Sequence, residues 1–253
     1  MTAQHDQDEP LLAAHDQTAA SWAAVEMRTR DEDSARYLGF FSDFQNAVEF
    51  KAYNAALAGT ASERALDVGC GTGRNTDALA SKSVVGIDLS RQELLLARER
   101  FGASVALLQA SATHLPFRDG AFDKLLCAGV LQHIPGDNQR ALVVEEMARV
   151  LSRPARLVLA AHAYPWVVRR MFEKERVEHN LFWHRFTPGE LDSLLRRFLS
   201  PCAIRIEGIC HLPRWRVGNR LGRPGVWLDR LLSKVPGLKH LSGAILVARI
   251  DRS

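Results

Sequence analysis

The sequence has no apolar run of the length that a bilayer span requires, so we expect no membrane span. Its opening, MTAQHDQDEP, lacks the basic start and the apolar core of a secretory signal peptide, which favours a cytoplasmic location. Cysteine is scarce, and the four residues lack metal-ligand spacing: Cys70, Cys127, Cys202 and Cys210. We therefore expect reduced, buried thiols and no metal site.

The composition is that of an ordinary globular protein, with 47% apolar and 25% charged residues. At 253 residues the chain can bury the core of one α/β domain. Residues 1–16 show no apolar periodicity and are expected to be disordered, which leaves 17–253 as a single domain. The sequence contains no internal repeat or low-complexity segment that would favour another organisation.

Charge is distributed unevenly along the chain. Residues 1–50 hold ten acids and three arginines, a net charge of −7, whereas residues 196–253 hold twelve Lys or Arg and three acids, a net charge of +9. A basic tail of this kind can meet nucleic acid, anionic lipid or an acidic substrate. It can equally be a solvated surface that faces the acidic N-terminal part, and the sequence leaves both readings open.

Residues 64–90, RALDVGCGTGRNTDALASKSVVGIDLS, carry the main motif. A short buried strand over 64–68 leads into a turn with alternating glycines, which are Gly69, Gly71 and Gly73. Glycines at this spacing let the backbone turn sharply and let a ligand approach the main chain. We expect a helix to open near Arg74 and a second strand over 83–87 to end on Asp88. An acid at this distance from the turn is typical of a nucleoside-binding βαβ unit.

The residue at the sixth place of the glycine motif distinguishes a dinucleotide-binding unit from other nucleoside-binding units. A dinucleotide fingerprint has glycine at its sixth place, where this chain has Arg74. Asp67 adds negative charge beside the turn, which suits a cationic amino-acid group better than a diphosphate. The string LDVGCGTG, with Asp88 ending the next strand, resembles the class I S-adenosylmethionine-dependent methyltransferases. A nicotinamide-binding oxidoreductase and a glycine turn without a ligand are the alternatives.

The resemblance extends to the stretch SATHLPFRDGAFDKLLCAGVLQHI, residues 111–134. The family usually has an acid, which contacts the adenine amino group, where this chain has Ser111. The family pattern implies that S-adenosylmethionine is bound, and S-adenosylhomocysteine released, by residues on the first four strands and their loops. These are Asp67, Gly69, Cys70, Gly71, Gly73, Asp88, Leu89, Ser111, Ala112, Gly129 and Val130.

His133 lies in the loop that follows the predicted fourth strand, Asp123 to Ala128. Ligands of open α/β sheets bind beyond the carboxyl ends of the strands, so this loop should border the reacting methyl group. An imidazole has a suitable unperturbed pKa for a general base. The competing role is a hydrogen bond to the backbone that holds the loop, because many methyltransferases work by proximity alone.

Two segments are unusually aromatic, one before the first strand and one after the fifth. The first belongs to a predicted helical cap over 17–60, with a helix or helix pair over 34–57 that Gly59 closes. The second lies in 162–186, where the resemblance places substrate-binding insertions, as it does for 211–243. Acceptor-binding candidates there are Tyr164, Trp166, Trp183 and His184. Plain core packing explains the aromatics equally well.

The remaining elements are predicted from periodicity and end signals. Helices are expected over 18–28, 91–100, 137–151 and 226–235, and strands over 105–109, 156–161, 203–209 and 244–250. Thr187 should cap a helix over 188–198, with Glu190 completing a capping box.

Together the residues and the resemblance predict an α/β fold. We expect a Rossmann-like, mostly parallel seven-stranded sheet with an antiparallel last strand, helices on both faces and a cofactor-binding core at 64–161. The expected reaction is methyl transfer from S-adenosylmethionine to a small-molecule acceptor, first to oxygen, with nitrogen or carbon as alternatives. A non-catalytic cofactor-binding protein is a further alternative. Nucleic acid is not expected as the acceptor, because no Asn-Pro-Pro-Tyr-type tetrapeptide lies beside the fourth strand. The oligomeric state is left open.

Overall fold

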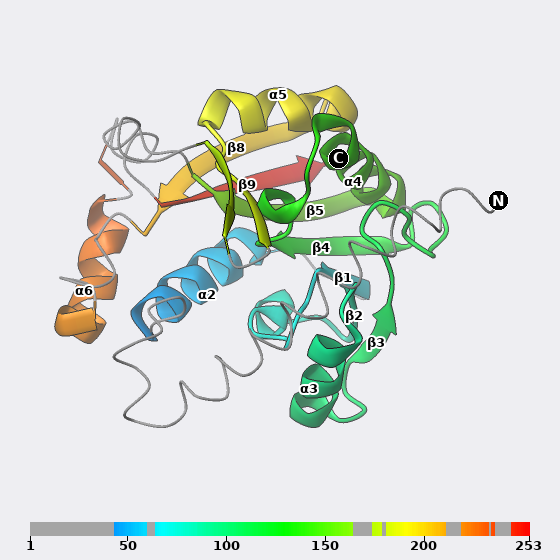
Figure 1. The fold of residues 1–253 in the computed structure, drawn as a ribbon, viewed down its shortest axis with the longest axis horizontal. Helices are drawn as coiled ribbons and strands as arrows, with labels where there is room; N and C mark the ends of the chain where they lie inside the picture. The colour runs from blue at the N-terminus through cyan, green and yellow to red at the C-terminus, as the bar shows by residue number, and fades with distance from the viewer. Residues whose placement is uncertain are drawn as a thin grey trace.

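The computed structural model describes residues 43–59, 64–163, 174–178, 181–210, 219–232, 234–235 and 244–253. A seven-stranded sheet forms its centre, in the order β3-β2-β1-β4-β5-β9-β8 (Figure 1). The strands are β1 (Arg64–Val68), β2 (Ser83–Asp88), β3 (Ala106–Gln109), β4 (Phe122–Ala128), β5 (Leu151–His162), β8 (Ala203–Ile209) and β9 (Ile245–Arg252). A separate antiparallel hairpin pairs β6 (Glu175–Glu178) with β7 (Leu181–His184).

The sheet is parallel from β3 to β5, and β9 runs antiparallel to both of its neighbours, β5 and β8. The sequence-based prediction of a mostly parallel sheet with an antiparallel last strand is therefore confirmed. Strand order reverses between β1 and β4, because the chain builds outward through β2 and β3 before returning to β4. Such a switch point leaves a crevice beyond the carboxyl ends of the two strands.

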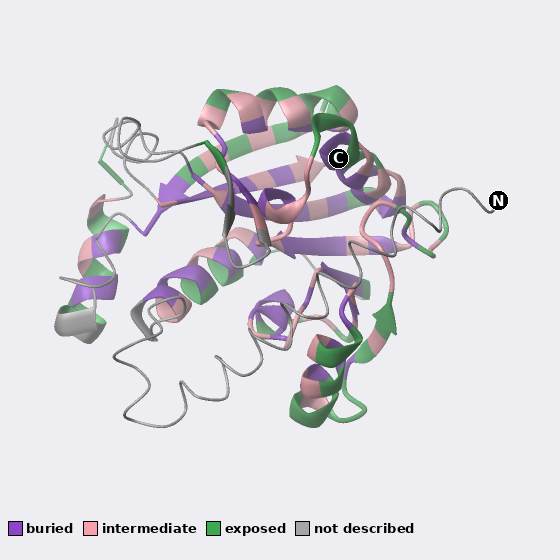
Figure 2. Ribbon diagram, viewed as in Figure 1, coloured by how far each residue is buried: buried purple, intermediate pink, exposed green. Residues whose placement is uncertain are grey.

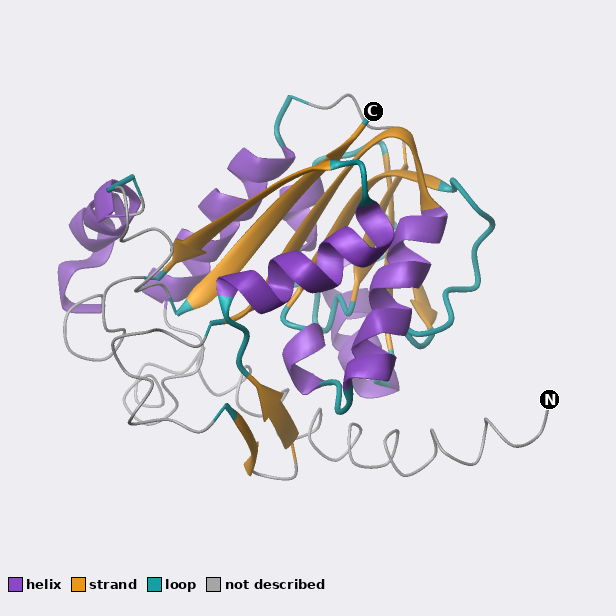
Figure 3. Cartoon of the chain, turned by 90° about the horizontal axis from the view of Figure 1, so that it is seen from above, coloured by secondary structure: helices purple, strands orange, loops and turns teal. Residues whose placement is uncertain are grey.

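Helices cover both faces of the sheet (Figure 3). They are α2 (Asp43–Leu57), α3 (Arg91–Phe101), α4 (Asp137–Val150), α5 (Pro188–Leu199) and α6 (Asn219–Leu232), with 3-10 turns η2 (Thr76–Leu79) and η3 (Leu131–His133). Among the described residues, no helix combines the length and the apolar character needed to cross a bilayer.

Alternate residues of the central strands supply two separate cores (Figure 2). Leu125 and Leu157 pack with α4 and α5 on one face, whereas their neighbours Leu126 and Val158 pack with α2 and α6 on the other. Successive side chains of a strand point to opposite faces, so strands buried on both sides must be apolar at nearly every position. This explains the continuous apolar runs of β4 and β5.

Most predicted elements agree with the structure within one or two residues, and Thr187 and Glu190 form the predicted capping box of α5. The predicted helix near Arg74 is wrong. Residues 71–75 are turns, and only the short 3-10 helix η2 follows, ending at Ala80 in the left-handed region with φ 44°. The connection between β1 and β2 is short, and the glycine turn uses much of it, so too few residues remain for a full α-helix.

Two further boundaries differ. The fifth strand, predicted over 156–161, begins at Leu151 and ends at His162. The helix predicted over 226–235 is α6, which begins earlier, at Asn219, and ends at Leu232. It continues through Pro224, and its buried face packs against α2. Among the thiols, Cys202 is only half-buried. The predicted helix over 18–28, the rest of the cap before 43, and Tyr164 and Trp166 lie outside the described residues.

Candidate functional site

A pocket lies where strand order reverses, between the loops that follow β1 and β4. Its walls also include the ends of β2 and β3, so four adjacent parallel strands contribute. The lining residues are Gly69, Asp88, Leu89, Ala110, Ser111, Ala112, Thr113, Gly129, Val130, His133, Ile134, Pro135 and Gln139. The walls are mainly apolar, and Asp88 is their one acid.

The glycine turn is held against the end of β2 by its backbone. Cys70 N donates to Ile87 O at 2.9 Å, and Gly73 N donates to Cys70 O at 2.9 Å. A Cβ on Gly69, which has φ 69°, would lie 2.2 Å from Val130 Cγ2, and one on Gly73 would lie 2.1 Å from the Phe101 ring. Side chains at these two positions would force the loops apart, so glycine is required for the crevice to keep its shape.

Asp88 is fixed at the end of β2 by two backbone donors. Gly71 N donates to Asp88 Oδ2 at 2.9 Å, and Ser90 N donates to Asp88 Oδ1 at 2.8 Å. The carboxylate is therefore held in place at the edge of the pocket before a ligand binds.

Asp67 lies inside the protein, below the glycine turn, and is 2% exposed. Thr76 Oγ1 donates to its Oδ2 at 2.6 Å. Burial raises the pKa of Asp67 to about 7, opposed by the Thr76 hydrogen bond and supported by the nearby charge of Asp88. Asp67 does not belong to the pocket wall, so any effect of its charge on a ligand acts through the turn.

Arg74 joins the glycine turn to the cap helix α2. Its Nη1 donates to Glu49 Oε2 at 2.8 Å and to Asn46 Oδ1 at 2.9 Å. Glu49 is buried, and Gln45 Nε2 also donates to it. Burial, followed by the charge of Glu49, raises the pKa of Tyr53 well above its usual value. Arg74, which stands where a dinucleotide fingerprint has glycine, thus anchors α2 on the glycine turn.

Ser111 stands where the resemblance implies an acid, and it lines the pocket. Its hydroxyl lies 2.8 Å from Thr113 Oγ1, which in turn lies 3.0 Å from His114 Nδ1. A hydroxyl can accept from an amine as well as donate, so this wall keeps a polar group although it carries no charge.

His133 reaches the pocket from η3 and is oriented by the β6–β7 hairpin. Its Nδ1 lies 3.0 Å from Phe182 O, and its ring meets the Trp183 ring edge-on with centroids 4.4 Å apart. Trp183 also meets the His162 ring at 5.1 Å. A carbonyl oxygen only accepts, so the contact assigns the proton of a neutral imidazole to Nδ1 and leaves the lone pair on Nε2.

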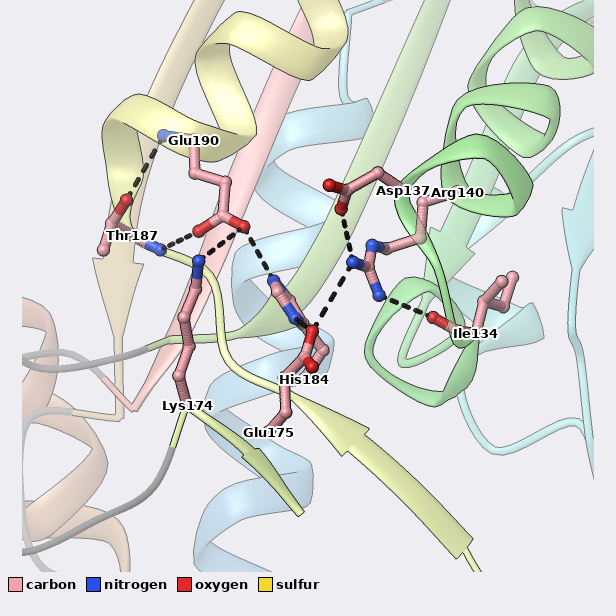
Figure 4. A network of polar contacts seen from close by, with 8 residues as sticks. All are labelled: Ile134, Asp137, Arg140, Lys174, Glu175, His184, Thr187 and Glu190. Carbon is pink, nitrogen blue, oxygen red and sulfur yellow. Dashed lines mark hydrogen bonds and ion pairs between the residues drawn. The ribbon is translucent and has the colours of Figure 1, made fainter. Parts of the chain in front are cut away.

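An ionic cluster around the buried His184 fastens the same hairpin to α4 and α5 (Figure 4). His184 Nδ1 lies 2.7 Å from Glu175 Oε1, and its Nε2 lies 2.8 Å from Glu190 Oε1. Arg140 and Lys174 reach Glu175 and Glu190 at 3.7 and 3.1 Å. Burial works to raise the pKa of Glu190, but the hydrogen bonds from His184 and Lys174 outweigh it and hold the pKa at about 2.

The pocket fits S-adenosylmethionine by the chemistry of its donors and acceptors. The carboxylate of Asp88 would suit the two ribose hydroxyls, and the apolar side chains of Leu89, Ala112 and Val130 would suit the adenine ring. The turn behind the glycines is the 3-10 helix η2, so it does not present the α-helix N-terminus that holds a pyrophosphate in dinucleotide-binding units. In the described part of the chain, no three His, Cys, Asp or Glu side chains gather as metal ligands.

The structure brings together eight of the predicted site residues in the pocket wall: Gly69, Asp88, Leu89, Ser111, Ala112, Gly129, Val130 and His133. Asp67, Cys70, Gly71 and Gly73 lie in or below the turn and support it. Trp183 and His184 are buried in the hairpin, where Trp183 contacts His133 and His184 contacts the ionic cluster. Sequence reasoning missed Ala110, Thr113, Ile134, Pro135 and Gln139. Ala110 follows a predicted strand directly, which was a usable signal.

Comparison with known proteins agrees with this arrangement. A family model described as "Methyltransferase domain" matches residues 66–159. The chain is 32% identical over 214 residues to the O-methyltransferase resE of Aspergillus sclerotiorum, with 77% of this chain and 78% of that protein covered. It is 33% identical over 114 residues to a probable tRNA methyltransferase 9B of Mus musculus, with 44% of this chain and 24% of that protein covered.

Solved structures share the fold. A 1,6-didemethyltoxoflavin-N1-methyltransferase of Burkholderia thailandensis, with S-adenosylhomocysteine bound, superposes with a TM-score of 0.58 at 17% identity, covering 100% of this chain and 92% of that one. The chain spans only 24–38% of the length of four curated relatives, the tRNA methyltransferases 9B among them.

Proposed function

Because the chain belongs to the S-adenosylmethionine-dependent methyltransferases, we propose that it methylates a hydroxyl oxygen of a small molecule, with His133 as the general base. The observation that carries this proposal is that His133 lines the pocket and that its ring is held there by the contact of Nδ1 with Phe182 O at 3.0 Å. One relative, matched over 77% of this chain, is named an O-methyltransferase, which supports oxygen as the acceptor atom.

The chain's own residues would act by positioning and by accepting one proton. When bound, the cofactor supplies a methyl group that is already electrophilic. Asp88 would hold the ribose through its carboxylate, which Gly71 and Ser90 orient. As the acceptor oxygen forms its bond to the methyl carbon, its proton would pass to His133 Nε2, so that no free alkoxide is needed. The hairpin keeps this imidazole in the useful tautomer and away from other rotamers.

Transfer RNA is the second candidate acceptor, since several relatives are named tRNA methyltransferases and residues 196–253 carry a net charge of +9. A small molecule is the better candidate, because the O-methyltransferase relative is matched over 77% of this chain, whereas the tRNA methyltransferase relatives are matched over 44–54% of it. A base extruded from RNA usually needs stacking and hydrogen-bonding partners that recognise its edge.

The test uses methyl-labelled cofactor with three acceptor pools: phenols and alcohols, amines, and bulk tRNA. We expect label in a hydroxyl compound as an ether. With that acceptor, His133→Gln should lower kcat by about 10²–10⁴, while calorimetry shows unchanged cofactor affinity. Arg118→Gln, a variant of an exposed loop residue outside the pocket wall, is the control and should retain activity.

Three outcomes contradict parts of this proposal. Label that enters tRNA alone, or amines alone, overturns the acceptor class. If kcat does not change in His133→Gln, His133 holds its loop and is not the general base; the assignment of methyl transfer is not affected. A parallel loss of cofactor affinity in His133→Gln would show that the residue serves binding and not proton transfer.

A further inference from the structure

Helix α6 lies beyond the carboxyl end of β8 (Figure 1), and a hydrogen bond to Cys210 anchors it there. Its Val226 packs with the α2 core, and its Asp229 is 1% exposed and accepts a hydrogen bond from Cys210 N at 3.1 Å. Cys210 directly follows β8, which is parallel to β5 because both are antiparallel to β9. The carboxyl ends of β1, β4 and β8 therefore share one edge, and α6 lies at that edge.

The opposite face of α6 presents apolar side chains to solvent. Pro224, Trp227 and Leu231 are three and four residues apart, so they lie on one stripe of the helix. Trp227 is 64% exposed, the highest fraction among the large apolar side chains that are described. Leu221 and Val235 extend the exposed apolar surface at the two ends of this stripe. Scattered exposed apolar residues are ordinary, but a continuous stripe on one element marks an interaction surface.

The exposed charges along this stripe are all positive. Arg223 and Arg230 each precede a stripe residue by one position, and Lys234 follows at the end of the helix; all three are exposed. Asp229 is the one acid of α6, and it is buried on the other face. An exposed helix face with Trp and Leu beside Lys and Arg is the pattern of helices that lie in the plane of an anionic membrane surface.

We propose that the exposed face of α6 docks on a bilayer that contains anionic phospholipids. Trp227 and Leu231 enter the headgroup region, while Arg223, Arg230 and Lys234 meet the lipid phosphates. Since α6 lies at the edge where the pocket opens, docking turns that edge toward the lipid. This surface is separate from the pocket wall, so the proposal stands whether or not the acceptor assigned above is correct.

The test is co-flotation of the full chain with vesicles of phosphatidylcholine, with and without phosphatidylglycerol. We expect binding to the anionic vesicles only. The double variant Trp227→Ala, Leu231→Ala should lower partitioning by about tenfold or more, and Arg223→Glu should lower it by about fivefold or more. Matched controls are Leu95→Ala, an exposed leucine of α3, and Arg118→Glu, an exposed loop arginine; both should bind like wild type.

Because the varied side chains are exposed, melting temperatures should stay unchanged, which separates lost docking from lost folding. Brominated lipid should quench the wild-type tryptophan emission and spare it in Trp227→Phe, which still floats. Equal flotation with neutral and anionic vesicles, or no flotation at all, overturns the proposal. So does a result in which the α6 variants lose binding to bulk tRNA while vesicles never bind, since nucleic acid is then the partner.

Discussion

Asp67→Asn tests whether a buried carboxyl below the glycine turn opposes folding at neutral pH. Burial raises its pKa from 3.8 to about 7. Between these values the unfolded chain has lost the proton that the folded chain keeps, so stability falls as pH rises. The slope is about 1.4 kcal/mol per pH unit. Because the folded aspartate is already half ionised at pH 7, this slope decreases near pH 7, and the free energy of unfolding should fall by about 2 kcal/mol from pH 5 to pH 7.

An asparagine has the same shape and can still accept the Thr76 hydroxyl, but it does not titrate. The variant should thus gain stability relative to wild type as pH rises from 5 to 7, and the gain should level off above pH 7. Any fixed cost of the amide, such as an unpaired N–H, cancels when two pH values are compared. The difference between the pH values carries the prediction, not the absolute stability of the variant.

The assay is urea unfolding of both proteins, free of cofactor, at pH 5, 6, 7 and 8, with equal m-values as the condition for comparison. Asp251→Asn is a control of opposite sign. Burial works against its charge, but hydrogen bonds from Arg249 and Arg156 hold the pKa of Asp251 below its usual value, so this variant should lose stability at neutral pH. A stability difference for Asp67→Asn that stays constant from pH 5 to pH 8 would refute the reasoning.

The other predictions concern the pocket and the hairpin. Asp88→Asn should weaken S-adenosylmethionine binding by about 10- to 150-fold, because a hydrogen bond to a charged group contributes about 1.5–3 kcal/mol; calorimetry measures this, and unchanged affinity would remove Asp88 from the site. Trp183→Ala should lower the free energy of unfolding by about 3–5 kcal/mol, since the ring is buried between His133 and His162. Chemical unfolding measures this loss, and the control Trp183→Phe should keep most of the stability. If Trp183→Ala loses less than about 1 kcal/mol, the hairpin does not depend on this packing.

Local signals were sufficient for much of the fold and for one wall of the site. Alternating glycines, a strand that ends on Asp88 and the Thr187 capping box each depend on residues close in sequence, and the structure confirms the elements that they predict. The cofactor class followed from the string LDVGCGTG together with Asp88. These features are readable because each depends on backbone conformation or on side-chain type at a short spacing.

Two features came only from contacts between distant segments. Arg74 looked like a departure from a fingerprint, and the structure shows that it binds Asn46 and Glu49 of α2. The β6–β7 hairpin carried no clear pattern, because its short strands are held by an ionic cluster and by the packing of one side chain, Trp183, against His133 and His162.

The sequence by itself determined the strand-turn-strand core around the glycines, the seven strands of the main sheet and the cofactor, since apolar period and glycine spacing act locally. Only the tertiary structure decided the tautomer of His133, because it depends on Phe182 O, a carbonyl of a hairpin far along the chain. It also decided that Asp67 lies below the turn instead of in the pocket wall. Burial and the partner of a side chain are properties of the packed chain, and no spacing in the sequence encodes them directly.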